Sequence, residues 1–169
     1  MNIQEKILEQ GKIKEIIEKN KKQGRKIGFC SGCYDIIHSG HAAFFQLCKE
    51  ISDILIVSVG KDDVVRELKG FNRPINPEQS RVLMIAAMQD VDYVVLGEEL
   101  KEMRPGKIDF YNIIRGIMPD FFLLNEDDSA IKEKQELCDE LGIKLKLISR
   151  AKEHPSTSEI IKKINHIGK

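Results

Sequence analysis

Apolar and polar positions alternate along the chain in two recurring patterns. The first is a short apolar run, rich in β-branched residues and bounded by Gly or polar residues; such runs lie at 26–30, 53–59, 93–96, 120–124 and 143–148. Runs of this kind are typical of strands that are buried on both faces, as in a parallel sheet. The second pattern repeats every three or four residues, which predicts amphipathic helices. It covers 41–51, 61–68, 77–89, 108–116, 129–141 and 156–164.

The order of these elements predicts the fold class. Strands that alternate with helices are typical of an α/β fold in which right-handed crossovers join parallel strands. We therefore expect a Rossmann-like, doubly wound parallel sheet of about five strands in a single domain. In such a sheet, ligands bind beyond the carboxyl ends of the strands, near the point where the strand order reverses.

The first 24 residues form a segment of different character. Their apolar residues follow roughly helical spacing (Ile3, Ile7, Leu8, Ile13, Ile16 and Ile17), and Gly11 interrupts them. Two short helices therefore match the pattern as well as one. A polar stretch at 20–25 ends the segment, with Gly24 as the expected C-cap. We expect an N-terminal helical segment over 1–24 and the main domain over 25–169.

A strand-turn-helix at 29–41 carries the most specific chemistry in the sequence. A Gly- and Ser-rich turn joins the predicted strand to the predicted helix, and it holds His38 and His41. Free backbone N–H groups and the helix dipole favour an anion at such a helix start. Two imidazoles there can donate to phosphate oxygens, or transfer a proton, near neutral pH. The less specific interpretation is a turn with two inert surface histidines.

Composition and charge narrow the classes of function. The chain has 169 residues, which suits one domain with a full core. Lys and Arg together number 27, as do Asp and Glu, so the formal net charge is zero. This balance argues against nucleic acid or an anionic membrane as a partner, because both require a basic excess. No apolar run approaches the roughly 20 residues of a membrane span. The charged N-terminus is unlike a secretory signal, so we expect a cytoplasmic protein.

Four cysteines leave a second class of function open. Cys30 and Cys33 form a Cys-x-x-Cys pair, which is typical of redox or zinc sites, and His38 and His41 complete a spacing that resembles a four-ligand site. No other clustered cysteine pair exists in the sequence. The alternative is that Cys30 and Cys33 are small, partly buried side chains in a reducing cytosol.

The stretch around the two histidines resembles a known family. Gly32-Cys33-Tyr34-Asp35 followed by His38-Ser39-Gly40-His41 is similar to the signature of the cytidylyltransferase-like nucleotidyltransferases. The resemblance is greatest to the nucleotidyltransferase domain of ADP-heptose synthases, followed by glycerol-3-phosphate cytidylyltransferases, and it extends over about 25–164. It implies an enzyme that transfers a nucleotidyl group (CMP or AMP) from an NTP to a phosphorylated sugar or polyol and releases pyrophosphate.

The resemblance also implies roles for individual residues. His38 and His41 would contact the triphosphate and stabilise the charge that grows on the α-phosphate, with Lys69 as a third catalytic residue. Nucleotide contacts would come from Cys33, Tyr34, Gly40, Arg81, Ser156, Thr157 and Ser158. Arg73, in the loop 69–77, would bind the acceptor phosphate through bidentate bonds. Asp35 would contact the substrate or orient the turn. The alternatives are a flexible basic loop for 69–77 and a plain helix N-cap for Ser156.

The segment 125–128 departs from the family pattern. ADP-heptose synthases usually carry a Lys-Gly-Gly-Asp type of sequence here, whereas this chain has Asn125-Glu126-Asp127-Asp128. Asp127 would contact substrate hydroxyls, or the carboxylates would cap the helix that follows. We therefore expect a polyhydroxylated phosphate as acceptor and heptose 1-phosphate as a poor one. Arg150 lies one residue further from the serine motif than in the cytidylyltransferases.

Cofactor and partners follow from the reaction class. We expect Mg²⁺ on the triphosphate, held mostly by phosphates and water, with no metal site formed by the protein. The expected partners are an NTP, the phosphorylated acceptor and a second copy of the chain in a homodimer. The sequence does not decide whether the nucleotide substrate is ATP or CTP. A regulatory module that holds nucleotide without turnover is the other alternative, favoured if Lys69 and Arg73 point away from the histidine turn.

Overall fold

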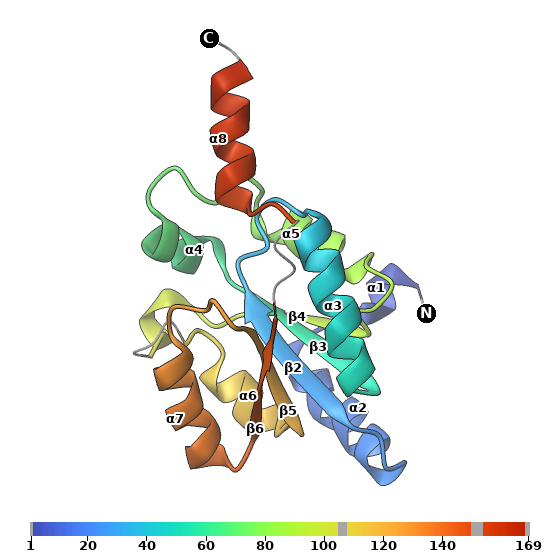
Figure 1. The fold of residues 1–169 in the computed structure, drawn as a ribbon. Helices are drawn as coiled ribbons and strands as arrows, with labels where there is room; N and C mark the ends of the chain where they lie inside the picture. Colours follow the sequence, from blue (N-terminus) through green and yellow to red (C-terminus); the bar gives the residue numbers. More distant parts are fainter. Residues whose placement is uncertain (1, 105–107, 150–153, 168–169) are drawn as a thin grey trace.

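Six parallel strands form one sheet in the order β1-β4-β3-β2-β5-β6 (Figure 1). The computed structural model describes residues 2–104, 108–149 and 154–167. The strands are β1 Ile7–Leu8, β2 Ile27–Gly32, β3 Ile54–Val59, β4 Tyr93–Leu96, β5 Phe121–Asn125 and β6 Lys144–Ile148. The central strands β2 and β3 pair along their whole length. From β2 the chain adds strands first on one side and then, from β5, on the other, so the switch point lies between β2 and β5.

Helices cover both faces of the sheet. They are α1 Ile3–Lys6, α2 Gln10–Lys22, α3 Ser39–Ile51, α4 Asp62–Lys69, α5 Glu78–Ala86, α6 Tyr111–Ile117, α7 Ile131–Leu141 and α8 Thr157–Ile167, with a 3₁₀ turn, η1, at Leu100–Glu102. Side chains of α2, α6 and α7 share one apolar cluster with one face of the sheet. Side chains of α3 and α5 share a second cluster with the other face. The doubly wound, Rossmann-like arrangement expected from the sequence is confirmed.

The alternation of side chains along the buried strands builds these two clusters. In β2, Phe29 points into the first cluster and Cys30 into the second, and both are fully buried. The rings of Phe29, Phe110 and Phe122 meet pairwise at centroid distances of 5.5, 5.6 and 5.3 Å. Apolar side chains on both faces explain why these strands read as near-continuous apolar runs.

The sheet has one strand more than the sequence predicted. Ile7 and Leu8 form the edge strand β1 and pair with Val94 and Val95 of β4. The expectation of about five strands is therefore corrected to six. Helices α1 and α2 flank β1, in agreement with the helical spacing of the first 24 residues. The pattern missed β1 because two apolar residues within a helical repeat carry no strand signal of their own.

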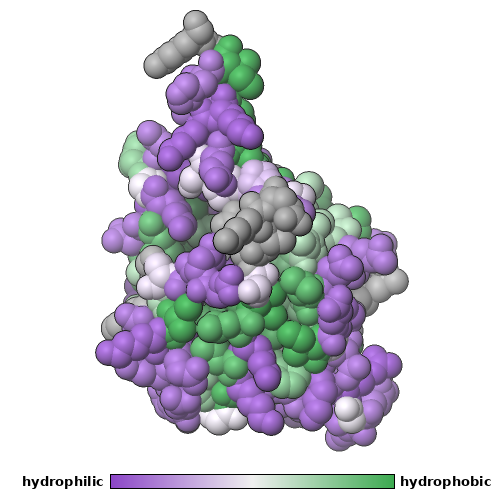
Figure 2. Space-filling view, viewed as in Figure 1, coloured by the Kyte–Doolittle hydropathy of each residue, from purple (hydrophilic) through white to green (hydrophobic). Residues whose placement is uncertain are grey.

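The last helix extends away from the sheet. Figure 1 shows α8 as a rod above the carboxyl ends of the strands, with its start near α3. Figure 2 shows an apolar band over the edge strand β6, between α7 and α3. Leu147 of β6 is half exposed. Within the described ranges, no helix combines the length and the apolar character that crossing a membrane requires.

Candidate active site

A cavity of about 350 Å³ opens at the carboxyl ends of the central strands, at the switch point between β2 and β5. Its walls come from the turn after β2, the first turn of α3, the end of α4, the loop 70–77, the end of β5 and the starts of α7 and α8. Every predicted site residue except Arg81 and Asp127 lines it. The fold thus brings together residues from three distant parts of the sequence.

The two histidines of the turn are stacked on each other. Their ring centroids lie 3.9 Å apart with an interplanar angle of 24°. His38 is the N-cap of α3 in an extended backbone conformation, and the backbone N–H of His41 donates to its carbonyl at 3.0 Å. A Cβ on Gly40 would stand 3.0 Å from Nδ1 of His38 and 3.3 Å from Cβ of His154. A side chain at Gly40 would therefore displace the first imidazole of the pair.

The ring of Tyr34 packs against the ring of His41. Its ring meets that of His41 edge-on at 5.3 Å and that of Phe45 at 5.5 Å. Its backbone has a φ of 49°, in the left-handed region, and its hydroxyl donates to Sγ of Cys30 at 3.6 Å. Burial, together with the neighbouring cysteine, raises the pKa of this hydroxyl well above its usual range. Tyr34 is therefore a neutral, buried support that fixes the plane of His41.

Asp35 fastens the loop 70–77 to the turn. Its buried carboxylate accepts hydrogen bonds from the backbone N–H groups of Ile75 and Asn76, and from Nε of Arg73 at 2.5 Å. Burial opposes ionisation, but the hydrogen bonds from Asn76 and Ile75 and the Arg73 guanidinium outweigh it and hold the pKa of Asp35 below its usual value. The structure thus gives Asp35 the orienting role and sets Arg73 and the exposed Lys69 on the cavity wall.

The structure does not bring Arg81 into the cavity. This side chain is 1% exposed. Its Nε donates to the carbonyl of Asn76, its Nη1 to the carbonyl of Cys33 and its Nη2 to Oδ1 of Asp62. Arg81 lies behind the cavity wall and joins the loop 70–77, the turn after β2 and the start of α4. Because only 1% of this side chain is exposed, contact with a nucleotide would require the side chain or the residues that cover it to move.

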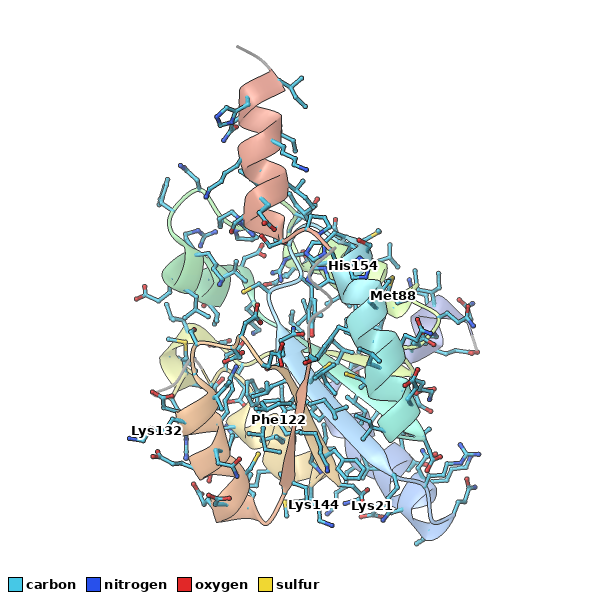
Figure 3. All side chains as sticks on the ribbon, in the orientation of Figure 1. Lys21, Met88, Phe122, Lys132, Lys144 and His154 are labelled. Atoms are coloured by element: carbon cyan, nitrogen blue, oxygen red, sulfur yellow. The ribbon has the colours of Figure 1, made fainter. Side chains whose placement is uncertain are left out.

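The start of α8 closes the cavity above the histidine turn. Ser156 and Glu159 exchange hydrogen bonds in a capping box, and Oγ1 of Thr157 donates to the carbonyl of Ile36 at 3.3 Å. His154 lies next to α3, where Nδ1 is 3.0 Å from Oγ of Ser39 (Figure 3). Ser158 lines the cavity together with Ser156 and Thr157. The N-cap interpretation of Ser156 is confirmed by its bond to the backbone N–H of Glu159, and a contact between the serine motif and a nucleotide stays a prediction. Arg150 lies outside the described residues.

The cysteines divide between the core and the cavity. All four are free thiols, and Cys30 is fully buried in the second apolar cluster. Cys33 lines the cavity, and burial raises the pKa of its thiol although the charge of Lys69 opposes this effect. A thiol with a raised pKa is a poor nucleophile at neutral pH. The different surroundings of the two sulfurs favour packing residues over a Cys-x-x-Cys redox pair.

Only part of the acidic segment 125–128, which begins at the end of β5, lines the cavity. Asp127 is exposed and is not part of the cavity wall, whereas Asn125 and Asp128 are. Asp128 accepts from the backbone N–H of Ala130 at 2.9 Å and from Nζ of Lys134 at 2.8 Å. Asp128 therefore stabilises the turn before α7, but the predicted helix cap is wrong in detail, because the N-cap residue is Ala130 and α7 has no side-chain cap hydrogen bond. A contact between Asp127 and substrate stays a prediction.

Two charged residues of the cavity wall were not predicted as site residues from the sequence. Asp109 and Lys134 are 7% and 6% exposed, and both line the cavity. Lys134 left a signal, because it stands three residues after Ile131 and three before Leu137 on the buried stripe of α7. Asp109 left none, since the apolar pattern assigned it to a helix over 108–116, whereas α6 begins only at Tyr111 and leaves Asp109 in the preceding loop.

Burial of Asp109 predicts a pH-dependent stability. Burial, together with the carboxylates of Glu98 and Asp63, raises its pKa from 3.8 to about 6. The folded state therefore holds a proton that the unfolded state releases, and the contribution of Asp109 to stability falls as the pH rises through this range. We expect Asp109→Asn to gain up to about 3 kcal/mol relative to wild type above about pH 7, and little at about pH 4. Chemical denaturation of both proteins at several pH values measures this difference; a difference that does not change with pH would contradict it.

Comparison with known proteins agrees with this geometry. A doubly wound parallel sheet with a His-x-Gly-His turn at its switch point defines a Rossmann-like protein of the nucleotidyltransferase type. Residues 29–163 match the sequence model of the cytidylyltransferase-like family, and the chain belongs to that family. The resemblance seen in the motif at 32–41 is thereby confirmed.

Individual relatives extend the match beyond the motif. The chain is 38% identical over 161 residues to the bifunctional protein HldE of Wolinella succinogenes, which covers 95% of this chain and 31% of the relative. It is 36% identical over 159 residues to the HldE protein of Helicobacter pylori (strain J99), which covers 94% of the chain and 31% of the relative. The chain thus spans about a third of the length of these curated relatives.

Solved structures show the same fold. A lipopolysaccharide core biosynthesis protein from Thermoplasma volcanium superposes with a TM-score of 0.62 at 28% identity, over 76% of this chain and 98% of that one. The pantoate-beta-alanine ligase of Francisella tularensis superposes with a TM-score of 0.64 at 20% identity, over 95% of this chain and 77% of that one. The second likeness concerns the fold alone.

Proposed function

We propose that the chain catalyses nucleotidyl transfer from an NTP to the phosphate of a phosphorylated sugar or polyol, with release of pyrophosphate. The observation that carries this proposal is the stacked pair of His38 and His41 in a cavity that also receives Lys69, Arg73 and the hydroxyls at the start of α8. A triphosphate needs donors along its whole length, and here they come from several elements around one space.

The chemistry follows from this arrangement. An oxygen of the acceptor phosphate attacks the α-phosphorus in line, the new P–O bond forms, and the bond from the α-phosphorus to the bridging oxygen of pyrophosphate breaks. No covalent enzyme intermediate is needed. Transfer at phosphorus asks the protein mainly for positioning and for stabilisation of charge. His38 and His41 would supply donors to the α-phosphate, and Lys69 would neutralise the acceptor phosphate. The N-terminus of α8 would bind the outer phosphates.

Magnesium would enter with the nucleotide. Within residues 2–104, 108–149 and 154–167, no cluster of three His, Cys, Asp or Glu side chains is arranged to hold a metal. In this proposal Mg²⁺ would be bound mainly by phosphates and water, and it would neutralise charge on the triphosphate. Pyrophosphate release with each common NTP identifies the nucleotide, ATP or CTP.

The acceptor is a phosphorylated polyhydroxyl compound in this proposal. The relatives named bifunctional protein HldE and the solved lipopolysaccharide core biosynthesis protein support a place in carbohydrate metabolism. The segment 125–128 differs from the Lys-Gly-Gly-Asp type expected in ADP-heptose synthases. We infer from this difference that heptose 1-phosphate is a poor acceptor. The proposal includes a cytoplasmic location and a homodimer, which light scattering on the purified protein tests.

Pyrophosphate release tests the proposal. The purified chain is assayed with Mg²⁺ and each common NTP against glycerol 3-phosphate, several hexose 1-phosphates, pentose 5-phosphates and heptose 1-phosphate. We expect release that requires both an NTP and one class of acceptor. Nucleotide binding without pyrophosphate release in any combination would favour a regulatory module instead. The position of Lys69 and Arg73 on the wall of the histidine cavity argues against that module.

The cysteines provide a test of the redox or zinc alternative. Because Cys30 is a core residue and Cys33 a lining residue with a raised pKa, we expect Cys30→Ala/Cys33→Ala to retain most of the wild-type turnover. Metal analysis of the purified wild type should find no stoichiometric zinc. Activity that strictly requires zinc, or a disulfide between the two residues, would overturn the transferase proposal.

A further inference from the structure

Two buried charges on the cavity wall have no role in the transfer described above. Asp109 lies just before α6, and Lys134 lies in the first turns of α7. Both side chains are more than nine-tenths buried, and both line the same cavity as the histidine pair. Burying a charge is costly unless the charge has a partner. Lys134 has such a partner in Asp128, so the group that indicates a ligand contact is the carboxylate of Asp109.

The position of Asp109 is set by two glycines. A Cβ on Gly60 would lie 3.1 Å from Oδ2 of Asp109, and a Cβ on Gly97 would lie 2.8 Å from the same atom. These glycines follow β3 and β4 directly, so the carboxylate rests against the carboxyl ends of both strands. A Cβ at Gly97 would force the carboxylate to shift and one at Gly60 would crowd it, so the two glycines let the carboxylate lie against the backbone.

The carboxylate of Asp109 retains hydrogen-bonding capacity. Its own backbone N–H and the charge of Lys134 favour the ionised form, whereas Glu98 and Asp63 oppose it. Among the residues that the structure describes, no other residue's side chain donates a hydrogen bond to it within 3.5 Å. A carboxylate has about four acceptor sites, so several remain for a ligand in the cavity.

Lys134 retains capacity of the opposite kind. Its ammonium donates to Oδ2 of Asp128 at 2.8 Å, and Asp128 is the more exposed partner of this ion pair. An ammonium has three donors, so two are available for other groups. The cavity wall therefore offers acceptors on Asp109 and donors on Lys134.

Hydroxyl groups match this combination better than other ligand groups do. A hydroxyl both donates and accepts, so a pair of them can donate to Asp109 and accept from Lys134. A phosphate would be repelled by the carboxylates of Asp109 and Asp128. The same cavity also carries His38, His41 and Lys69, whose donors and positive charge suit phosphates instead. The cavity therefore offers groups for hydroxyls and groups for phosphates.

We propose that Asp109 and Lys134 form a polyol subsite that binds hydroxyl groups of the acceptor sugar. The assignment to the acceptor, which rests on the proposed function, follows from the nearness of Asp109 to Lys69, since both charges act on the thiol of Cys33. Asp109 rests against the ends of β3 and β4, and α4, which ends at Lys69, follows β3. Lys69 would then hold the acceptor phosphate, and Asp109 the hydroxyls of the same molecule.

Substitution of Asp109 tests the subsite. Asp109→Asn keeps the size of the side chain but removes the charge and one acceptor. Because a hydrogen bond to a charged group is lost, we expect the KM for the acceptor found in the pyrophosphate assay to rise about 10- to 100-fold. The KM for the NTP should stay within about threefold of wild type. Lys134→Gln should show the same division between the two substrates.

Matched controls separate this effect from charge changes in general. Asp139→Asn and Lys132→Gln alter exposed residues of α7, and Lys132 points away from the body of the molecule (Figure 3). Both controls should keep both KM values of wild type. The melting temperature of each variant verifies its fold, and Asp109→Asn should melt no lower than wild type at neutral pH.

Two arms of the experiment identify the source of the hydroxyls. Acceptor analogues that lack one hydroxyl each are compared on wild type and Asp109→Asn; removal of the recognised hydroxyl should abolish the difference between the enzymes. With 2′-deoxy- and 3′-deoxy-NTP, the two enzymes should lose the same factor. A difference confined to the deoxynucleotides would mean that Asp109 binds ribose, which overturns the assignment to the acceptor.

The outcomes also separate the subsite from the proposed function. Wild-type turnover with an unchanged acceptor KM in Asp109→Asn would overturn the subsite and leave the transferase activity intact. Absence of turnover by wild type with every NTP and acceptor would overturn the proposed function, and the subsite with it.

Discussion

His41→Ala should lose about 100- to 1000-fold in kcat, and His38→Ala should lose a similar factor, while both keep the wild-type fold. A donor aimed at charge that develops in the transition state is typically worth about this much. The two rings stack at 3.9 Å and belong to one turn, so removal of either one leaves the other without its neighbour. Steady-state pyrophosphate release measures kcat, and circular dichroism verifies the fold.

A matched histidine provides the control. His166 lies near the end of α8, is exposed, and contacts the carbonyl of Lys162 within its own helix. His166→Ala should therefore keep wild-type kcat and KM. If His41→Ala or His38→Ala turned over at nearly the wild-type rate, the histidine pair could not be the group that stabilises the α-phosphate.

Arg81→Met should lower the free energy of unfolding by about 3–5 kcal/mol, which is a loss of roughly 10 °C in Tm for a chain of this size. The substitution leaves Asp62 and the carbonyls of Cys33 and Asn76 without their donor. Arg81→Lys should also destabilise the protein, because one ammonium cannot reproduce the planar fork of the guanidinium. Thermal unfolding with and without NTP measures both effects.

Arg115 offers the corresponding control, because it is exposed on α6. Arg115→Met should change Tm by no more than a degree or two, as surface substitutions usually do. The resemblance to the family implied a direct nucleotide contact for Arg81. An Arg81→Met protein with wild-type stability and a raised KM for NTP would show that contact and refute the structural role.

The elements that the sequence predicted well are those whose signal is local. β3 is buried along its whole length, and its run of apolar, β-branched residues gives both its type and its bounds. Gly142 ends α7 with a φ of 69°, in the left-handed conformation expected of a C-cap glycine. The histidine turn was predicted as a site because all the residues of its motif lie within one short stretch of sequence.

What the sequence did not predict depends on contacts between distant parts of the chain. β1 exists because Ile7 and Leu8 meet β4, and two residues have no strand pattern. The sequence left two roles for Asp35, a substrate ligand or a support of the turn. The hydrogen bonds from the loop 70–77 to its carboxylate, which only the folded chain shows, favour the second role. The position of Asp109 depends on Gly60 and Gly97, which follow two other strands earlier in the sequence.

The most direct test of the central claim is ³¹P nuclear magnetic resonance of the complete reaction. The chain is incubated with Mg²⁺, the active NTP and the active acceptor until the substrates are consumed. We predict that the acceptor phosphorus and the α-phosphorus of the NTP are converted into a coupled pair of diphosphodiester signals, with one pyrophosphate formed for each product. Orthophosphate or a nucleoside diphosphate in place of that pair, or an unchanged spectrum, would contradict the account.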